Sequence, residues 1–501
     1  MLLPLVAIWA CGEQESPTAP AGAAPVNETA AAAGQLVVNT LADPGDGACN
    51  ATQCTLREAI NDPSGNAIVF ASGLRGTITL AGPAQGGGSL VIKRSLSITG
   101  PSTGITIRRR PADPAFRIMK VDPAVTVGLT KLALRNGRTD KQGGGILNYG
   151  TLTLTDCTVA GNTAAKYGGG IDNHGPLTLV RTTVSNNAGG GVDDHDVALT
   201  IRNSTITYNT GGGVANRAGG LTITNSTISY NGGTGIGHDW GTTTLDRVRI
   251  VGNSGGGVYG HQGTIAVSNS AILRNSTTGD GGGIATAQMR LTVTGSTIAY
   301  NTAGGNGGGI SSRSWVRSSY RTTLTNTTVS GNSAAYGGGV ALSDGYDAGG
   351  LGTFVNSTIA FNSATSAGGG IYETSNEDAV VQFTNSIFAK NAAVTGADLA
   401  IHTVLRGASH NLIGDGAGTG FTNEDGNIVG NVAPYNAPVD PLLGPLANNG
   451  GPTSTHALLA GSPAIDAGTS DGCPGIDQRG VTRPQGPACD MGSYELEAAG
   501  N

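Results

Sequence analysis

The chain has 501 residues, of which 84 are glycine, while charged residues make up 12% and aromatic residues 4%. A helical enzyme of this length would carry roughly twice that share of charged residues and much more Leu, Glu and Lys. The formal net charge is −6, so no basic field offers a site for nucleic acid. Short runs of Val, Ile and Thr recur between glycine-rich turns, which favours an all-β protein.

The N-terminal residues indicate the cellular location of the protein. An apolar run over residues 1–10 ends at Cys11. This pattern resembles the end of a bacterial lipoprotein signal, over residues 1–11, in which Cys11 becomes the lipidated N-terminus. Residues 12–35 have the composition of a disordered tether. We therefore expect a secreted protein, held at the bacterial cell surface or outer membrane only by its lipid anchor.

The remaining cysteines suit an oxidising compartment. Cys49 and Cys54 lie five residues apart, and Cys473 and Cys489 lie together near the C-terminus. Each pair is expected to form a disulfide. Cys157 is left over inside a repeat, where a buried free thiol is expected. Nothing in the sequence has the ligand spacing of a metal site.

The middle of the chain is one repeat, copied about ten times. Each copy contains an asparagine, preceded in the last ten copies by Val, Ile or Phe three positions earlier, and glycine runs lead into another Ile or Val. The copies are 22 residues long where they are most regular and become longer after Asn275. The asparagines are Asn136, Asn162, Asn187, Asn209, Asn231, Asn253, Asn275, Asn301, Asn332, Asn362 and Asn391.

Each copy predicts three very short strands separated by turns, with no helical period. Parallel strands need long connections, and a chain that winds once per repeat meets that need. The prediction for residues 67–413 is therefore a parallel β-solenoid with three faces. Stacked Ile and Val would fill its interior, and stacked asparagines would form an amide ladder at a bend. The calcium-binding nonapeptide pattern is absent.

The two ends lack the repeat and are expected to close the solenoid. Thr55-Leu56-Arg57-Glu58 is a capping box that predicts a short helix within an N-terminal cap over residues 36–66. Residues 414–436 are expected to be a linker. Residues 437–497, rich in Pro, Gly and Asp, are expected to form an irregular C-terminal cap. In that cap an ion-paired network is predicted among Asp466, Asp477, Arg479, Arg483, Asp490 and Glu495.

Both ends resemble known modules. Residues 37–62, VVNTLADPGDGACNATQCTLREAIND, are similar to the CSLREA-type N-terminal module of bacterial surface proteins, with Thr55 where that module usually has Ser. Residues 439–495, which include VDPLLGPLANNGGPTSTHALLAGSPAIDAG and DQRGVTRPQGPACDMGSYE, resemble the choice-of-anchor Q domain found after right-handed parallel β-helix repeats. The resemblance implies a right-handed β-helix displayed at a bacterial surface, and the number of repeats predicts about 10 to 12 coils. It implies no particular reaction.

One column of residues carries the candidate chemistry. The second and fourth residues after each glycine run should point outward, because the first is the buried Ile or Val. In five consecutive coils these pairs are Asp172/His174, Asp193/His195, Ala215/Arg217, Gly237/Asp239 and Tyr259/His261. The predicted ligand-binding residues are Asp172, His174, His195, Arg217, His238, Asp239, Trp240, Tyr259 and His261. The candidate catalytic residues are Asp193, Asp194, His195 and Asp239.

This column supports several interpretations. Stacked carboxylate, imidazole, guanidinium and aromatic groups could bind a polysaccharide along the helix axis or a cell-surface partner. Adjacent Asp and His could instead do general acid–base chemistry, as in a polysaccharide lyase or glycoside hydrolase acting on acidic glycans. Carboxylates one coil apart could hold Ca²⁺, although no cofactor is required. The polar residues could also be the solvated edge of a structural stalk. We expect a monomeric binding protein.

Overall fold

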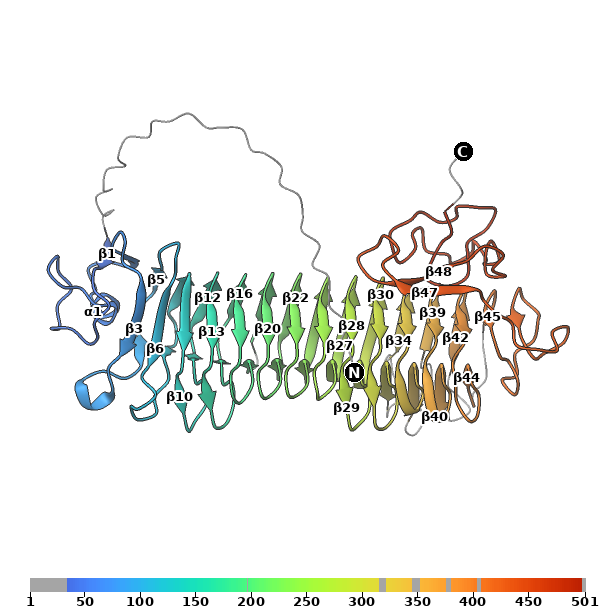
Figure 1. Cartoon of the computed structure of the whole chain (residues 1–501), viewed down its shortest axis with the longest axis horizontal. Coiled ribbons are helices and arrows are strands. Elements are labelled where there is room, and N and C mark those ends of the chain that lie inside the picture. The colour runs from blue at the N-terminus through green and yellow to red at the C-terminus, as the bar shows by residue number, and fades with distance from the viewer. Residues whose placement is uncertain are drawn as a thin grey trace, which may run out of the picture.

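The computed structural model describes residues 34–195, 197–314, 321–344, 352–374, 380–402 and 407–497. Within these ranges the chain winds into one long solenoid of short strands (Figure 1). Helical structure there is confined to α1 (Leu56–Asn61) and a single 3₁₀ turn at Pro83–Gln85. None of the described helices is long and apolar enough to cross a membrane. The predictions for Cys11 and most of the tether fall outside the described residues.

Each coil contributes three strands that pair in parallel with the same strands of the next coil. The first face of the central coils contains β7 (Met119–Val121), β11 (Ile146–Asn148), β15 (Ile171–Asn173), β18 (Val192–Asp194), β21 (Val214–Asn216) and β24 (Ile236–His238). The second contains β8 (Thr126–Thr130), β12 (Thr151–Thr155), β16 (Leu177–Val180), β19 (Leu199–Arg202), β22 (Gly220–Thr224) and β25 (Gly241–Asp246). The third contains β9 (Leu132–Arg135), β13 (Thr158–Ala160), β17 (Thr183–Ser185), β20 (Thr205–Thr207), β23 (Thr227–Ser229) and β26 (Arg249–Val251).

The pairing register is the repeat register of the sequence. The strands of the first two faces belong to one 25-stranded sheet, and those of the third face form a 15-stranded sheet. In β27 (Val258–Ser268) and β30 (Ile284–Thr294) the first two faces merge into single long strands. The predicted three-faced parallel β-helix is confirmed, because every central coil pairs with the next in parallel and without a register slip.

The interior is a stack of aliphatic side chains. Ile206, Ile228 and Ile250 lie in register on the third face and are fully buried. Side chains of a strand alternate between its two sides, so every second residue of each short strand enters this core. Burial of each such side chain stabilises the fold by about 1.5–3 kcal/mol.

The asparagine ladder is also present. The Asn209 Nδ2 donates to the Asn231 Oδ1 at 2.9 Å, and the same oxygen accepts the Asn209 backbone N–H at 3.1 Å. The pattern repeats from Asn162 to Asn391, where the Asp398 carboxylate accepts the last amide at 2.9 Å. Each amide thus satisfies backbone and side-chain groups of its neighbours at a buried bend.

Asn136 is not part of this ladder, which corrects the sequence alignment of the first copy. Leu134 pairs with Val159, so the residue in register with Asn162 is Gly137. The Gly137 N–H donates to the Asn162 Oδ1 at 2.8 Å. Asn136 itself occupies the turn with a φ of 59°. Asparagine tolerates this left-handed conformation, and that tolerance explains why it occurs one position early.

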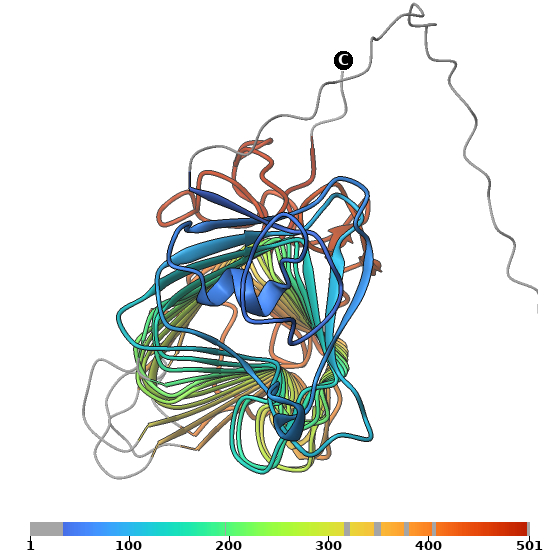
Figure 2. The same ribbon diagram turned by 90° about the vertical axis from the view of Figure 1, so that its left-hand side faces the viewer.

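The N-terminal segment lies across the first coils. Viewed from that end, α1 crosses the end of the solenoid (Figure 2). The Thr55 side chain accepts the Glu58 N–H and the Glu58 carboxylate accepts the Thr55 N–H, which is the predicted capping box. Leu56 and Ile60 are buried in the main core. The predicted Cys49–Cys54 disulfide closes the loop before the helix.

At the C-terminal end, residues 414–436 and residues 437–497 pack against different parts of the solenoid. Residues 414–436, expected to be a linker, pack on the last coils, where Phe421 and Val429 join the main core. Residues 437–497 lie along the side of the last coils, against the 15-stranded sheet (Figure 1). They contain the antiparallel pair β47 (Leu443–Ala447) and β48 (Thr455–Leu458) and the predicted Cys473–Cys489 disulfide.

The C-terminal segment docks through polar contacts around a small apolar patch. Thr328 of β35 (Thr328–Ser330) donates its hydroxyl to the Gln478 Oε1 at 2.7 Å. Leu458 and Met491 pack on Ile387 of β43 (Ile387–Ala389). The outward hydroxyls of the third face therefore serve as the docking surface for this segment.

Buried ion pairs hold the C-terminal segment together. Arg479 pairs with Asp477 at 2.8 Å and Arg483 pairs with Glu495 at 3.0 Å. The Asp490 carboxylate accepts backbone N–H groups, including that of Asp466, instead of pairing directly with an arginine. Burial raises the pKa of Asp490 to about 6. The segment is thus organised by hydrogen bonds as well as by charge pairs.

Candidate functional site

The candidate residues lie along the first face, where each short strand ends. In β15 the Ile171 side chain enters the core, Asp172 points out, Asn173 points in, and His174 follows outward just after the strand. Asp172 is in register with Asp193, which brings His174 beside His195 in the next coil. The repeat therefore stacks the same kinds of side chain one strand spacing apart, about 4.8 Å.

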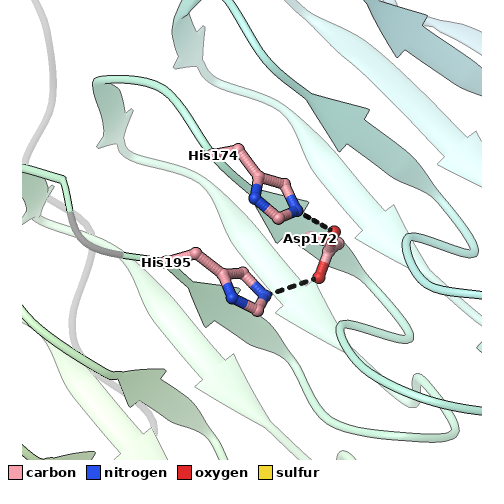
Figure 3. A group of neighbouring side chains, drawn as sticks. All are labelled: Asp172, His174 and His195. Carbon is pink, nitrogen blue, oxygen red and sulfur yellow. Dashed lines mark hydrogen bonds and ion pairs between the residues drawn. The ribbon is translucent and has the colours of Figure 1, made fainter.

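Asp172 lies at the centre of a compact arrangement (Figure 3). The His174 Nε2 is 2.8 Å from one carboxylate oxygen of Asp172, and the His195 Nε2 is 3.1 Å from the other. The two imidazole rings stack with centroids 4.3 Å apart and an interplanar angle of 7°. The Asp172 side chain is 0% exposed, so a residue that points out of the coil is buried beneath two rings.

A second carboxylate and an arginine extend this arrangement. The Asp193 Oδ1 lies 3.1 Å from the His195 Nε2 and 3.4 Å from the Arg217 Nε. Burial raises the pKa of Asp193, and the neighbouring Arg217 and His195 oppose that rise. Arg217 keeps 40% of its side chain exposed, so its guanidinium is accessible from solvent.

Two tyrosines that the sequence pattern did not single out complete the group. Tyr149 stacks on the His174 ring at 4.8 Å, and the Arg217 guanidinium lies 4.4 Å from the Tyr167 ring centroid. Tyr149 is the fourth residue after its glycine run, so the same counting rule applied one coil earlier identifies it. Together these residues form the Asp172 cluster: Tyr149, Tyr167, Asp172, His174, Asp193, His195 and Arg217.

A smaller aromatic group lies further along the same face. Trp240 is 55% exposed and Tyr259 is 42% exposed. The His261 ring meets the Trp240 ring edge-on at 5.9 Å. Asp239 is exposed beside them. From Tyr149 to His261 the column crosses five coil spacings, or about 24 Å.

Two candidates lie inside the coil, which corrects the sequence prediction. Asp194 is fully buried and accepts the side-chain amides of Asn173 and Asn216. His238 is 1% exposed, and burial lowers its pKa. Both occupy the third position after the glycine run, whose side chain points inward. They belong to an interior polar column and cannot contact a polymer lying on this face.

The Asp172 cluster has the groups for three kinds of chemistry. Partly exposed imidazole and guanidinium groups can donate hydrogen bonds to a bound ligand. An imidazole oriented by a buried carboxylate can exchange protons with a substrate. Two imidazole nitrogens that converge on one carboxylate can also ligate a metal ion. The residues of the smaller aromatic group offer flat surfaces for stacking.

Comparisons with known proteins agree with the fold. Residues 143–279 match the family model of the right-handed beta helix region, and the protein is a right-handed parallel β-helix. No curated protein matches the sequence.

This chain is also similar, at low scores, to several solved structures. The crystal structure of pectate lyase Pel9A is 12% identical, with 93% of this chain and 97% of that chain covered, at a TM-score of 0.36. The periplasmic alginate epimerase AlgG is 12% identical, with 64% and 78% covered, at a TM-score of 0.35. The AlgE6 A-module of an Azotobacter vinelandii mannuronan C-5 epimerase is 15% identical, with 74% and 88% covered, at a TM-score of 0.28. Similarities of this size decide nothing about activity.

Proposed function

We propose that the protein binds an extended polysaccharide on its first face, with the polymer axis along the solenoid axis. The observation that carries this proposal is the in-register column from Tyr149 to His261, which presents rings and polar groups over about 24 Å. The partly exposed Arg217 and the exposed Trp240 lie in successive parts of it. A row of shallow contacts suits a chain of sugar rings better than a compact ligand.

Local charge pairing indicates the kind of polymer. Asp172 interacts with His174 and His195, Asp193 with Arg217, and Lys120 with Asp122 at 2.7 Å. Arg217 and Lys120 each pair with a carboxylate, so neither cation is left unpaired to select an acidic chain. Recognition would depend on ring stacking and on hydrogen bonds to hydroxyl groups. We therefore favour a neutral, hydroxyl-rich polysaccharide over a strongly acidic one.

Catalysis is a second candidate, and one observation favours it. The buried Asp172 carboxylate holds both imidazoles by their Nε2 atoms, as an orienting carboxylate does in acid–base sites. In a lyase or hydrolase, His195 or Asp193 would exchange the proton. Removing such a group would abolish turnover while leaving retention of the polymer nearly intact.

A glycan screen separates these functions. The purified protein would be tested against acidic and neutral polysaccharides for both retention and bond cleavage. For a binding face, Trp240→Ala, Arg217→Ala and His174→Ala should each weaken retention partially, because many contacts share the energy. Tyr208→Ala is the matched control, since Tyr208 is 56% exposed beside the third face. A protein that retains no glycan in the panel would instead be a structural stalk.

Anchoring by lipid is a separate part of the proposal. A lipidated Cys11 followed by the tether would hold the solenoid at a membrane surface. Full-length protein produced with a functional export signal should partition into detergent, and Cys11→Ala should release it into the aqueous phase. If the Cys11→Ala protein stays in the detergent phase, another feature holds it there.

A further inference from the structure

We propose that Asp172, His174 and His195 form a binding site for a divalent transition-metal ion of the zinc class. The inference rests on the geometry of these three residues and does not require that the protein bind glycan. The three side chains come from two adjacent coils, β15 and β18, and from the turns that follow them. Their candidate ligand atoms all lie within 4.8 Å of one another.

The donor atoms already converge. Both Nε2 atoms point at the same carboxylate, one at each oxygen, at 2.8 and 3.1 Å (Figure 3). Ligand atoms of a tetrahedral site with metal–ligand bonds of about 2.0–2.1 Å are separated by about 3.3 Å. An ion could therefore enter among the three groups with only small side-chain rotations.

The solenoid backbone fixes this arrangement. The His174 N–H donates to the Asn148 carbonyl at 2.8 Å, and the His195 N–H donates to the Asn173 carbonyl at 2.9 Å. Both rings are thus attached to hydrogen-bonded backbone and stack in parallel with each other. A site built on rigid elements loses little conformational entropy when it binds an ion.

The donor set selects the class of ion. Two imidazole nitrogens and a carboxylate suit Zn²⁺ and its neighbours such as Co²⁺ and Ni²⁺. Calcium prefers six to eight oxygen ligands, so the imidazoles disfavour the Ca²⁺ site suggested by the carboxylate spacing. Asp193, whose Oδ1 lies 3.1 Å from the His195 Nε2, lies beside this group and could accept a hydrogen bond from a water bound to the ion.

The burial of Asp172 supports the same conclusion. Its side chain is 0% exposed, and the contacts to its oxygens come from the two imidazoles. A buried carboxylate with two nitrogen partners is a common arrangement around a metal ion, because the ion compensates the charge that burial leaves poorly solvated. Arg217 and Tyr167 lie at the outer edge, where a ligand of the bound ion could contact them.

Metal titration of the purified, chelator-treated protein tests the site. Calorimetry with Zn²⁺ should show one ion per chain, and Ca²⁺ should bind far more weakly at the same concentration. With Co²⁺ the visible absorption of a nitrogen–oxygen site should appear. His174→Ala and Asp172→Asn should each weaken the binding of Zn²⁺ by more than about 10-fold. His261→Ala is the matched control, because His261 occupies the same position of a later repeat.

Histidine side-chain NMR tests the site in the unmodified protein, so its result does not depend on whether a variant folds. Addition of Zn²⁺ should shift the Nε2 resonances of His174 and His195 and leave those of His261 unchanged. The inference is overturned if Zn²⁺ binding survives His174→Ala, if His261 shifts equally, or if no stoichiometric binding occurs. Glycan retention measured in chelator tests the proposed function alone, so each proposal can fail without the other.

Discussion

Replacement of Asn231 by alanine tests how much the asparagine ladder stabilises the fold. Asn231 is 0% exposed. Its Oδ1 accepts both the backbone N–H and the side-chain amide of Asn209, at 3.1 and 2.9 Å. Its Nδ2 donates to the Asn253 Oδ1 at 2.9 Å and to the Ile206 carbonyl at 3.3 Å. One truncation therefore removes four hydrogen bonds at a buried bend.

The expected cost follows from the groups that lose a partner. The Asn209 backbone N–H and one hydrogen of its amide lose their acceptor, and the Ile206 carbonyl loses a donor. A buried donor without a partner costs about 1–3 kcal/mol. Such costs are not additive within a network, so we expect the free energy of unfolding to fall by about 3 kcal/mol. The Asn253 Oδ1 loses the Asn231 side-chain donor but still accepts the Asn231 backbone N–H at 3.0 Å, so its loss costs less.

Urea unfolding followed by circular dichroism measures this change. Thr222→Ala is the control, because Thr222 lies in the same coil and points outward from β22. It should alter stability by less than about 1 kcal/mol. Asn209→Ala combined with Asn231→Ala should cost less than the sum of the two single changes, since the orphaned amide is then absent. If Asn231→Ala costs no more than the Thr222 control, the ladder does not stabilise the fold.

Three further predictions concern the interior. Ile228→Asp should lower stability by more than about 4 kcal/mol in the same assay, because it buries an unpaired carboxylate, whereas Thr222→Asp should be tolerated. Burial raises the pKa of Asp398 to about 6, so its protonated form is favoured in the folded state. Its contribution of about 3 kcal/mol should be present below about pH 4 and be lost as the pH rises to about 6. Asp398→Asn should remove this fall in stability between about pH 4 and about pH 6. If the fall remains in the Asp398→Asn protein, other titrating groups cause it. Burial raises the pKa of Cys157 to about 11, so a thiol reagent at pH 8 should label this residue only after urea unfolding, and fast labelling of the folded protein would contradict the structure.

Much of the fold follows from the sequence because the repeat is nearly regular. A 22-residue spacing with Ile206 and Ile228 at equivalent positions allows one parallel register, since a slip of one residue would expose the core side chains. The asparagine at each bend was identified for the same reason. The first copy has Gly137 at the ladder position in place of asparagine. The neighbouring Asn136, a turn residue, was therefore assigned to the ladder, because spacing alone does not separate the two positions. The two disulfides could be assigned because each pair is close in sequence.

The position of residues 437–497 could not be read from their composition. They lack the repeat, and their docking on the 15-stranded sheet depends on contacts such as that between Thr328 and Gln478, which are 150 residues apart. Outward hydroxyls look alike on every coil, so nothing local distinguishes the covered coils from the exposed ones. Only the complete fold brings these segments together.

The sequence by itself determined which residues share a column; the tertiary structure decided which of them can act together. Counting from the glycine runs was sufficient to place Asp172, His174 and His195 on one face. Whether the rings would cover the carboxylate depended on side-chain rotamers and on the strand spacing between coils. The same count puts both His238 and Trp240 at inward positions, yet only His238 is buried. Trp240 is exposed because it lies beyond the end of β24 (Ile236–His238), and the count does not give that end.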